Sequence, residues 1–194
     1  ALVQVVEYLR AFLFGRMGWS PINGLLIISG AFGLFHKEKL VEAGGFNPDA
    51  VGEDMELVLR LHRVMKAKKE PYRITFVPDP VCWTDAPENL KDLKGQRVRW
   101  QHGLGQALAL NKSLILDRQG GAVSWVAIPF YLVFELLGPI IEVAGYFFIA
   151  FCAWQGWISW PQAGIFFGLA IGLGVLLSTS AIMLEELSFH MYPR

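Results

Sequence analysis

Apolar residues recur at helical spacing in the first part of the chain. Over residues 2–17 they are spaced by three and four, while Gln4, Glu7 and Arg10 fall elsewhere on the helical wheel, so an amphipathic helix is predicted. Residue types and flanking turn residues predict three further helices: residues 36–43, 53–69 and 87–110.

Short runs of apolar residues bounded by glycine or proline are typical of strands. Proline lacks a backbone donor and therefore bounds strands rather than occupying their interior. Four strands are predicted: residues 25–28, 31–35, 74–77 and 81–84. Because these strands alternate with helices and no segment repeats, we expect a mixed α/β fold in the first half, followed by an all-α region.

The charged residues are distributed very unevenly. Of the 34 Asp, Glu, Lys and Arg residues, 29 fall in residues 1–122 and five in residues 123–194, and residues 143–184 contain none. Crossing a bilayer once takes ~20 apolar residues. We therefore expect about two transmembrane helices, near residues 126–151 and 163–184.

Tryptophan and basic residues indicate how this region lies in the membrane. Three tryptophans between the two spans are typical of an interfacial belt: Trp154, Trp157 and Trp160. Six basic residues precede the first span: Lys91, Lys94, Arg97, Arg99, Lys112 and Arg118. Arg194 follows the second span, so the positive-inside rule places both flanks in the cytoplasm. We expect a multi-pass protein of the plasma or inner membrane, with a cytosolic domain over residues 1–118 and a membrane region over residues 119–194.

Composition excludes several classes of protein. Lys+Arg 17 balance Asp+Glu 17, which argues against a nucleic-acid partner. The two cysteines, Cys82 and Cys152, have no cysteine or histidine neighbours at ligand spacing. Neither a disulfide framework nor a structural zinc site is therefore expected.

Gly52, Glu53 and Asp54 stand at the start of a predicted helix. One interpretation is structural, because carboxylates in the first turn of a helix interact favourably with its exposed N–H groups and dipole. The other is functional, since a carboxylate on a rigid element can act as a general base toward an acceptor hydroxyl.

A second group of polar residues lies on the predicted helix over residues 87–110. Gln96, Arg99 and Trp100 are spaced i, i+3 and i+4, so they project from one face. A guanidinium suits a diphosphate, and a flat indole suits the apolar face of a sugar ring. The alternative is a basic helix beside the membrane that carries an interfacial tryptophan.

With both motifs in one chain, the sequence resembles the membrane-embedded family 2 glycosyltransferases, a group that includes the synthases of cellulose, hyaluronan and poly-N-acetylglucosamine. Residues 29–35 (Ser-Gly-Ala-Phe-Gly-Leu-Phe) resemble the acceptor-side segment of the family, and residues 44–46 its Gly-Gly-aromatic turn. Residues 52–54 resemble the Glu-Asp motif, and residues 96–100 match Gln-x-x-Arg-Trp. The resemblance covers essentially the whole chain and implies a GT-A-like catalytic domain, represented by its C-terminal part.

The resemblance implies an inverting transfer from a nucleotide-sugar, such as a UDP-sugar, to a glycan or lipid-linked acceptor. Asp54 would remove the proton from the acceptor hydroxyl, and Glu53 would orient Asp54 or cap the helix. Arg99, with Gln96, would stabilise the departing nucleoside diphosphate. Trp100 would hold the acceptor sugar.

The sequence also departs from the family pattern. Members hold Mg²⁺ or Mn²⁺ with an Asp-x-Asp motif, which occurs nowhere in these 194 residues. We therefore expect this chain to be the C-terminal part of a truncated catalytic domain that carries no metal ligands and is inactive alone. The alternative interpretation is a non-catalytic membrane accessory or glycan-binding protein derived from such a synthase.

Two further features have open interpretations. Glu135 and Glu142 are seven residues apart and would share a face of one helix, either lining a polysaccharide channel or lying at the interface or against other helices. The second feature is a basic run at the end of the helix over residues 53–69, which is either a solvated helix end or a contact for anionic lipid headgroups. Its members are Arg60, Arg63, Lys66, Lys68, Lys69 and Arg73.

Overall fold

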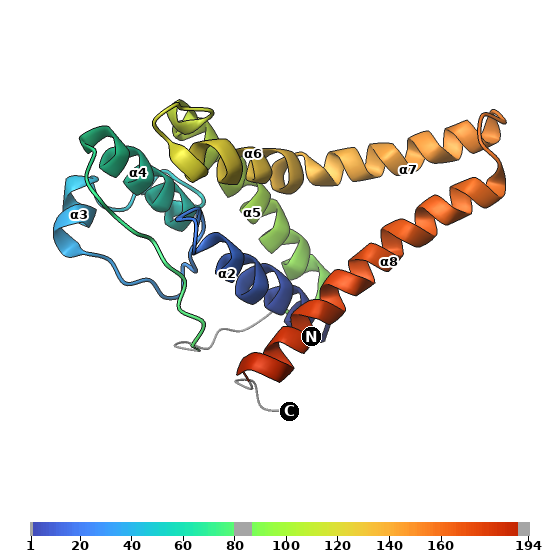
Figure 1. The fold of residues 1–194 in the computed structure, drawn as a ribbon, viewed down its shortest axis with the longest axis horizontal. Coiled ribbons are helices and arrows are strands. Elements are labelled where there is room, and N and C mark those ends of the chain that lie inside the picture. Colours follow the sequence, from blue (N-terminus) through green and yellow to red (C-terminus); the bar gives the residue numbers. More distant parts are fainter. Residues whose placement is uncertain (1, 80–86, 190–194) are drawn as a thin grey trace. The chain divides into compact units, whose positions relative to one another are not determined.

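The structure is a computed structural model that describes residues 2–79 and 87–189 (Figure 1). It is 69% helix and 1% strand. Its α-helices and its π- or 3-10 turns (η) are α1 Leu2–Tyr8, η1 Leu9–Phe14, α2 Gly15–Trp19, α3 Lys37–Glu42, α4 Glu53–Lys68, α5 Leu90–Leu110, η2 Lys112–Leu114, η3 Val123–Ala127, α6 Ile128–Phe130, η4 Tyr131–Leu136, α7 Gly138–Trp154, α8 Trp160–Leu184 and η5 Glu185–Phe189. The chain divides into two compact units, one over Gly15–Leu136 and the other comprising Leu2–Phe14 and the residues from Leu137 onward.

The prediction of an α/β fold, with a GT-A-like portion, is wrong for the residues that the structure describes. Residues 25–28, 31–35 and 74–77 are irregular rather than strands, and the β contact found in the described part is an isolated bridge between Ser29 and Phe32. The predicted strand over residues 81–84 lies outside the described residues.

Side chains take the backbone groups that a sheet would use. The carbonyl of Leu25 accepts a hydrogen bond from Nε2 of His62 at 3.0 Å, and the N–H of Ile74 donates to Oδ1 of Asn23 at 2.8 Å. A strand requires a ladder of backbone bonds to a neighbour. The apolar run that includes Leu25 is therefore buried as predicted but is not part of a sheet.

The structure confirms the helices predicted over residues 36–43, 53–69 and 87–110. The helix over residues 53–69 is α4, which ends where Lys69 adopts a left-handed φ of 57°. The helix over residues 87–110 is α5, and the side chain of its N-cap Asn89 accepts a hydrogen bond from the N–H of Asp92 at 2.9 Å. The helix over residues 36–43 is α3, followed by Gly44 with φ of 92°.

The unit over Gly15–Leu136 is organised around the packing of α4 on α5, which lie next to each other in Figure 1. Its main core joins residues from α4, α5 and the segment η3–α6–η4: Leu26, Met55, Leu59, Leu104, Ala107, Leu108, Leu114, Val123, Ala127, Ile128 and Tyr131. Trp19 of α2 packs on the same segment, with its ring 5.1 Å from that of Phe130. This core holds the N-terminal end of α4 in place.

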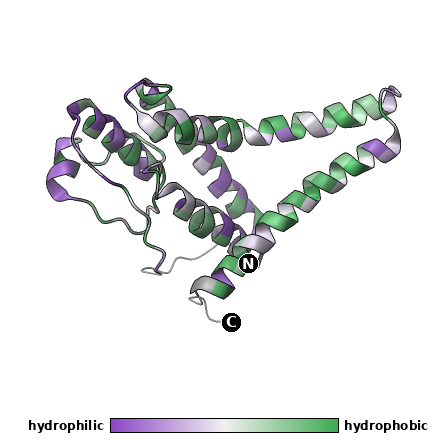
Figure 2. Cartoon of the chain, viewed as in Figure 1, coloured by the Kyte–Doolittle hydropathy of each residue, from purple (hydrophilic) through white to green (hydrophobic). Residues whose placement is uncertain are grey.

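The other unit consists mainly of apolar helices. In it α8 contacts α1, η1 and α7, and the rings of Tyr146 and Phe167 lie 5.6 Å apart. Figure 2 shows α7 and α8 coloured largely as hydrophobic. The segment Trp160–Leu187 is long and apolar enough to cross a membrane, and almost none of it is buried.

A break interrupts the first apolar segment at Leu137. Val123–Leu136 and Gly138–Trp154 are separate helical pieces that count as a second candidate span only if the bent pair is taken together. Glu135 lies on η4 and Glu142 on α7, so the continuous helical face expected for these two carboxylates is interrupted. The hydroxyl of Tyr146 donates a hydrogen bond to Glu142 within α7.

Candidate active site

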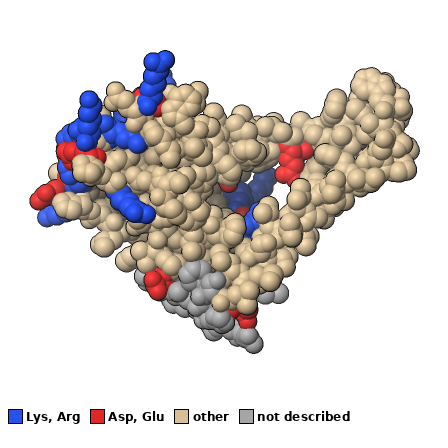
Figure 3. Space-filling model, viewed as in Figure 1, with Lys and Arg blue, Asp and Glu red and all other residues tan. Residues whose placement is uncertain are grey.

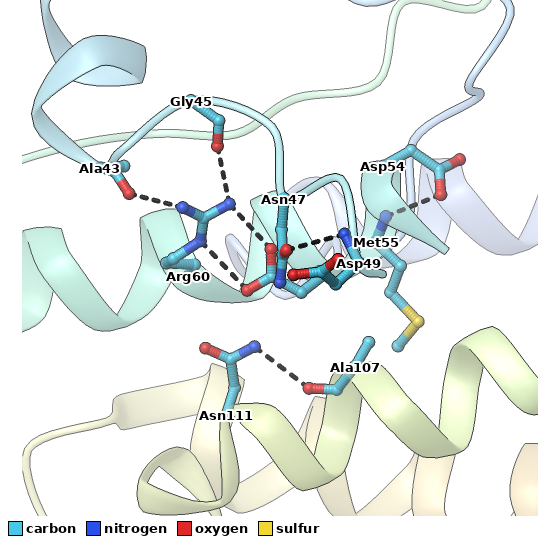
Figure 4. Close-up of polar contacts among 10 residues, drawn as sticks. Ala43, Gly45, Asn47, Asp49, Asp54, Met55, Arg60, Ala107 and Asn111 are labelled. Atoms are coloured by element: carbon cyan, nitrogen blue, oxygen red, sulfur yellow. Dashed lines mark hydrogen bonds and ion pairs between the residues drawn. The ribbon is translucent and has the colours of Figure 1, made fainter. Parts of the chain in front are cut away.

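Asp54 lies in the first turn of α4, at the place predicted for it. Its Oδ1 accepts a hydrogen bond from the N–H of Met55 at 2.8 Å, which fixes the orientation of the carboxylate (Figure 4). A Cβ added at Gly30 would lie 3.4 Å from Oδ2 of Asp54. One carboxylate oxygen is therefore anchored, and the other faces the segment over residues 29–35.

A pocket of about 320 Å³ opens beside Asp54. It is lined by residues 28–33 together with Phe35, Phe46 and Asp54. The rings of Phe35 and Phe46 meet edge to face, with centroids 6.1 Å apart. This volume lies at the lower end of the range for small-molecule pockets, and the lining combines aromatic rings with one carboxylate.

The surroundings of Asp54 alter its proton affinity. Burial raises the pKa of the Asp54 carboxyl, the negative charge of Glu53 raises it further, and the positive charge of Arg16 lowers it. Glu53 is exposed, whereas Arg16 on α2 is buried. Sequence reasoning missed Arg16, because a single arginine in an amphipathic helix carries no local indication that it is buried.

Arg60 on α4 holds the turn that carries Phe46. Its guanidinium donates to the carbonyls of Ala43 and Gly45, at 2.7 Å each, and pairs with Glu56 at 2.8 Å (Figure 4). The side chains of Arg60 and Glu56 are 14% and 4% exposed, so the interpretation of Arg60 as part of a solvated helix end is wrong. Arg60 instead fixes the Gly-Gly-Phe turn beside the pocket.

The rest of the basic run is more accessible. Figure 3 shows Lys and Arg side chains gathered over α3 and α4, while the visible surface of α7 and α8 carries few charges. Lys68 pairs with Glu42 of α3, and Lys69 is exposed. Contact of this run with anionic lipids stays a prediction.

Two glycines bring α4 and α5 together at the site. A Cβ added at Gly52 would lie 3.2 Å from Cα of Gly103, so the start of α4 touches the middle of α5. Gln106, one turn further along α5, accepts from the N–H of Val51 at 2.8 Å and donates to the carbonyl of Asp49 at 3.0 Å. These contacts fix the Gly-Glu-Asp segment against α5.

The residues of the Gln-x-x-Arg-Trp motif lie on α5, as predicted. Arg99 is exposed, and it lies one turn before Gly103 on the same helical face. The guanidinium of Arg97 lies over the ring of Trp100, 4.8 Å from its centroid, and Trp100 is 38% exposed. Gln96 is half-buried, and its Oε1 is buried without a hydrogen-bond partner in the part of the chain that the structure describes.

The structure thus brings some of the predicted site residues together and not others. Asp54 lines the pocket, whereas Gln96, Arg99 and Trp100 do not; they follow the face of α5 that passes the start of α4. Within residues 2–79 and 87–189, no three His, Cys, Asp or Glu side chains are grouped so that they could hold a metal ion.

The described part of the chain thus has a carboxylate beside a small pocket and a neighbouring helix that carries an arginine and a tryptophan. Comparison with known families gives the class: residues 6–174 match the family described as Glycosyl transferase family group 2. Since the match covers most of the chain, the protein belongs to this glycosyltransferase family, as predicted.

The similar curated proteins include poly-beta-1,6-N-acetyl-D-glucosamine synthases. A poly-beta-1,6-N-acetyl-D-glucosamine synthase from Staphylococcus aureus (strain COL) is 33% identical over 101 residues, which are 52% of this chain and 23% of that protein. The corresponding synthase from Staphylococcus epidermidis is 28% identical over 137 residues, 65% of this chain and 32% of that protein. The alignments thus span at most a third of these relatives. No solved structure gives a significant match.

Proposed function

We propose that this chain carries the acceptor and base half of a glycosyltransferase site, which transfers a sugar from a nucleotide donor to a glycan with inversion at the anomeric carbon. The acceptor is either a glycan or a lipid-linked molecule. The observation that carries the proposal is the anchored carboxylate of Asp54, which faces an aromatic-lined pocket. The similarity to poly-beta-1,6-N-acetyl-D-glucosamine synthases supports UDP-N-acetylglucosamine as the first donor to test.

In this mechanism Asp54 is the general base. Its Oδ1 is held by the N–H of Met55, so Oδ2 is the oxygen that receives the proton of the acceptor hydroxyl. The oxygen of that hydroxyl forms a bond to the anomeric carbon while the bond from that carbon to the nucleoside diphosphate breaks. The raised pKa of Asp54 increases its proton affinity and therefore strengthens it as a base. Glu53 contributes to that raised pKa by its charge.

The helix α5 supplies the leaving-group side of the proposed site. Negative charge develops on the departing diphosphate, and the exposed guanidinium of Arg99 can form a pair of parallel hydrogen bonds to it. Gln96 adds an amide on the same face. Trp100 presents an indole to the acceptor sugar, with Arg97 against its ring.

The setting of the reaction is part of the same proposal. In the described part of the chain, one or two helices are long and apolar enough to cross a membrane, which supports an enzyme of the plasma or inner membrane. The basic residues before the first span support a catalytic part that faces the cytosol. The family resemblance implies Mg²⁺ or Mn²⁺ in the complete enzyme. The roles proposed above rest on this chain's own side chains.

The test is sugar transfer by membranes that carry the full-length protein, with UDP-N-acetylglucosamine and other UDP-sugars, for the wild type and Asp54→Asn. Asparagine keeps an Oδ1 acceptor for the N–H of Met55 but cannot take a proton. We expect transfer to fall by about 10²- to 10⁴-fold while UDP binding is retained. The matched control is Asp49→Asn, which alters an exposed carboxylate that does not line the pocket.

Each outcome decides between two interpretations. Loss of transfer in Asp54→Asn but not in Asp49→Asn supports the base assignment and identifies the donor. If Asp54→Asn transfers sugar as fast as the wild type, Asp54 is a helix-start carboxylate and the proposed mechanism is wrong. If no UDP-sugar is consumed by the wild type, a non-catalytic accessory or glycan-binding role replaces the enzymatic one.

A further inference from the structure

The end of η4 at Leu136 leaves the carbonyls of Glu135 and Leu136 without backbone donors from their own helix. η4 is a π-helix, in which the carbonyl of residue i accepts from the N–H of residue i+5. For Glu135 and Leu136 these donors would be residues 140 and 141, but the N–H groups of both donate to the carbonyl of Leu137, at 3.0 Å each.

Gln101 of α5 supplies the missing donors. Its Nε2 donates to the carbonyl of Glu135 at 3.1 Å and to that of Leu136 at 2.8 Å. A carboxamide nitrogen carries two hydrogens, so one side chain can serve both carbonyls. One turn along α5, a Cβ added at Gly105 would lie 3.5 Å from Cδ1 of Leu136. The end of η4 therefore lies against a full turn of α5.

A second anchor holds α5 from the other side. Gly103, two residues after Gln101, packs against Gly52 at the start of α4. Two residues correspond to about 200° around a helix of 3.6 residues per turn, so the two contacts lie on opposite faces of α5. Arg99 and Trp100 directly precede this doubly anchored segment.

We propose that Gln101 is a positioning residue for glycosyl transfer: it ties α5 to the helix end before Pro139 and thereby fixes where Arg99 and Trp100 stand. This inference rests on the function proposed above for those two side chains. Gln101 is exposed and belongs to no part of the predicted motif. Its role follows from its two hydrogen bonds to the carbonyls at the end of η4.

The experiment uses the full-length protein in membranes, with UDP-N-acetylglucosamine as donor, and compares wild type, Gln101→Met and Gln101→Lys. Methionine has a similar length but cannot donate, whereas lysine retains N–H donors. We expect Gln101→Met to lower the rate at saturating donor by about tenfold, since misplacing reacting groups by about 1 Å costs up to about 10²-fold. UDP binding and the unfolding midpoint should stay near wild type, and Gln101→Lys should restore most of the rate.

Gln119→Met, which alters another exposed glutamine, is the matched control and should transfer sugar at the wild-type rate.

The positioning proposal is overturned if Gln101→Met transfers at the wild-type rate while Asp54→Asn is inactive. It is also overturned if the loss in Gln101→Met equals a loss of folded protein. If Asp54→Asn is fully active, the proposed function itself fails, and the two failures are thereby distinguished.

Discussion

Gly52 and Gly103 meet backbone to backbone, and a side chain at either position would crowd the other backbone. A Cβ on Gly103 would lie 3.0 Å from both Cα and N of Gly52, so the two backbones would have to separate by a few tenths of an ångström. The start of α4 approaches α5 this closely because both residues lack a side chain. This contact brings the turn that carries Asp54 beside the helix that carries Arg99.

Gly103→Ala is expected to separate α4 from α5. The added methyl group meets backbone rather than a flexible side chain, so the helices must move apart, and we expect a loss of about 1–3 kcal/mol in unfolding free energy. Sugar transfer should fall as well, because Asp54 and Arg99 move relative to each other. Denaturant unfolding in detergent and transfer assays measure the two effects.

The control for this prediction lies on the same helix. A Cβ added at Gly95 has nothing within 4 Å, so Gly95→Ala should leave transfer unchanged and raise the unfolding free energy by up to about 1 kcal/mol. Equal behaviour of the two variants would show that the contact between Gly52 and Gly103 is not needed.

The acid side of the pH–rate profile should respond to the neighbours of Asp54. Glu53 raises the pKa of Asp54 by its negative charge, so Glu53→Gln should lower that pKa and move the acid limb of kcat/KM to lower pH. Arg16 lowers the pKa of Asp54, so Arg16→Met should move the limb to higher pH. Shifts of the limb in opposite directions are expected.

The paired design of this experiment contains its own control. A change in folding or expression alters the amount of active enzyme but does not move the pH limb in opposite directions for two variants. If the limb stays in place in both variants, Asp54 does not titrate in the rate-determining step, and another group supplies the base.

Helices and motifs of this chain were predictable because their information is local. The apolar period and the flanking residues placed α4 within one residue of its observed end, and Asp54 at its start. The strands were not predictable, because short apolar runs fit a buried irregular segment as well as a strand. Whether Leu25 joins a sheet depends on the partner of its carbonyl, which here is His62, 37 residues away.

The parts of the site that sequence reasoning missed act through distant partners. Arg60 belongs by sequence to a basic run, and only its contacts with Ala43 and Gly45 show that it holds a turn. A glycine inside a helix, such as Gly103, was an available signal for a close approach between backbones. Nothing in the sequence indicated that Gln101 would bond the end of η4, because its acceptors are backbone carbonyls 34 and 35 residues away.

Arg60→Met is expected to destabilise the protein by about 3 kcal/mol, because it leaves the carboxylate of Glu56 buried without its partner and two carbonyls without donors. Adding Glu56→Gln should recover part of this loss, since the buried charge is removed. Arg63→Met, one turn away on α4, should cost less than about 1 kcal/mol. Thermal unfolding of the wild type, the two single variants and the double variant checks this order of stabilities. An Arg63→Met loss equal to that of Arg60→Met would contradict the stabilising role of the Arg60 contacts.

His62 should make the protein less stable as the pH falls from 6.5 toward 4. The ring is fully buried; Nε2–H donates to the carbonyl of Leu25, so Nδ1 accepts from the hydroxyl of Tyr72 at 2.7 Å. Burial lowers the pKa of His62 from 6.5 to about 4, so below pH 6.5 the unfolded chain binds a proton that the folded protein excludes. The difference in pKa between the folded and unfolded states corresponds to at most about 3 kcal/mol of unfolding free energy, present above pH 6.5 and lost by pH 4.

In His62→Gln the unfolding free energy should be lower at pH 7 but should fall less steeply between pH 6.5 and pH 4. His102→Gln, which alters an exposed histidine of α5, should keep the wild-type slope, and a wild-type slope in His62→Gln would assign the acid sensitivity to other groups.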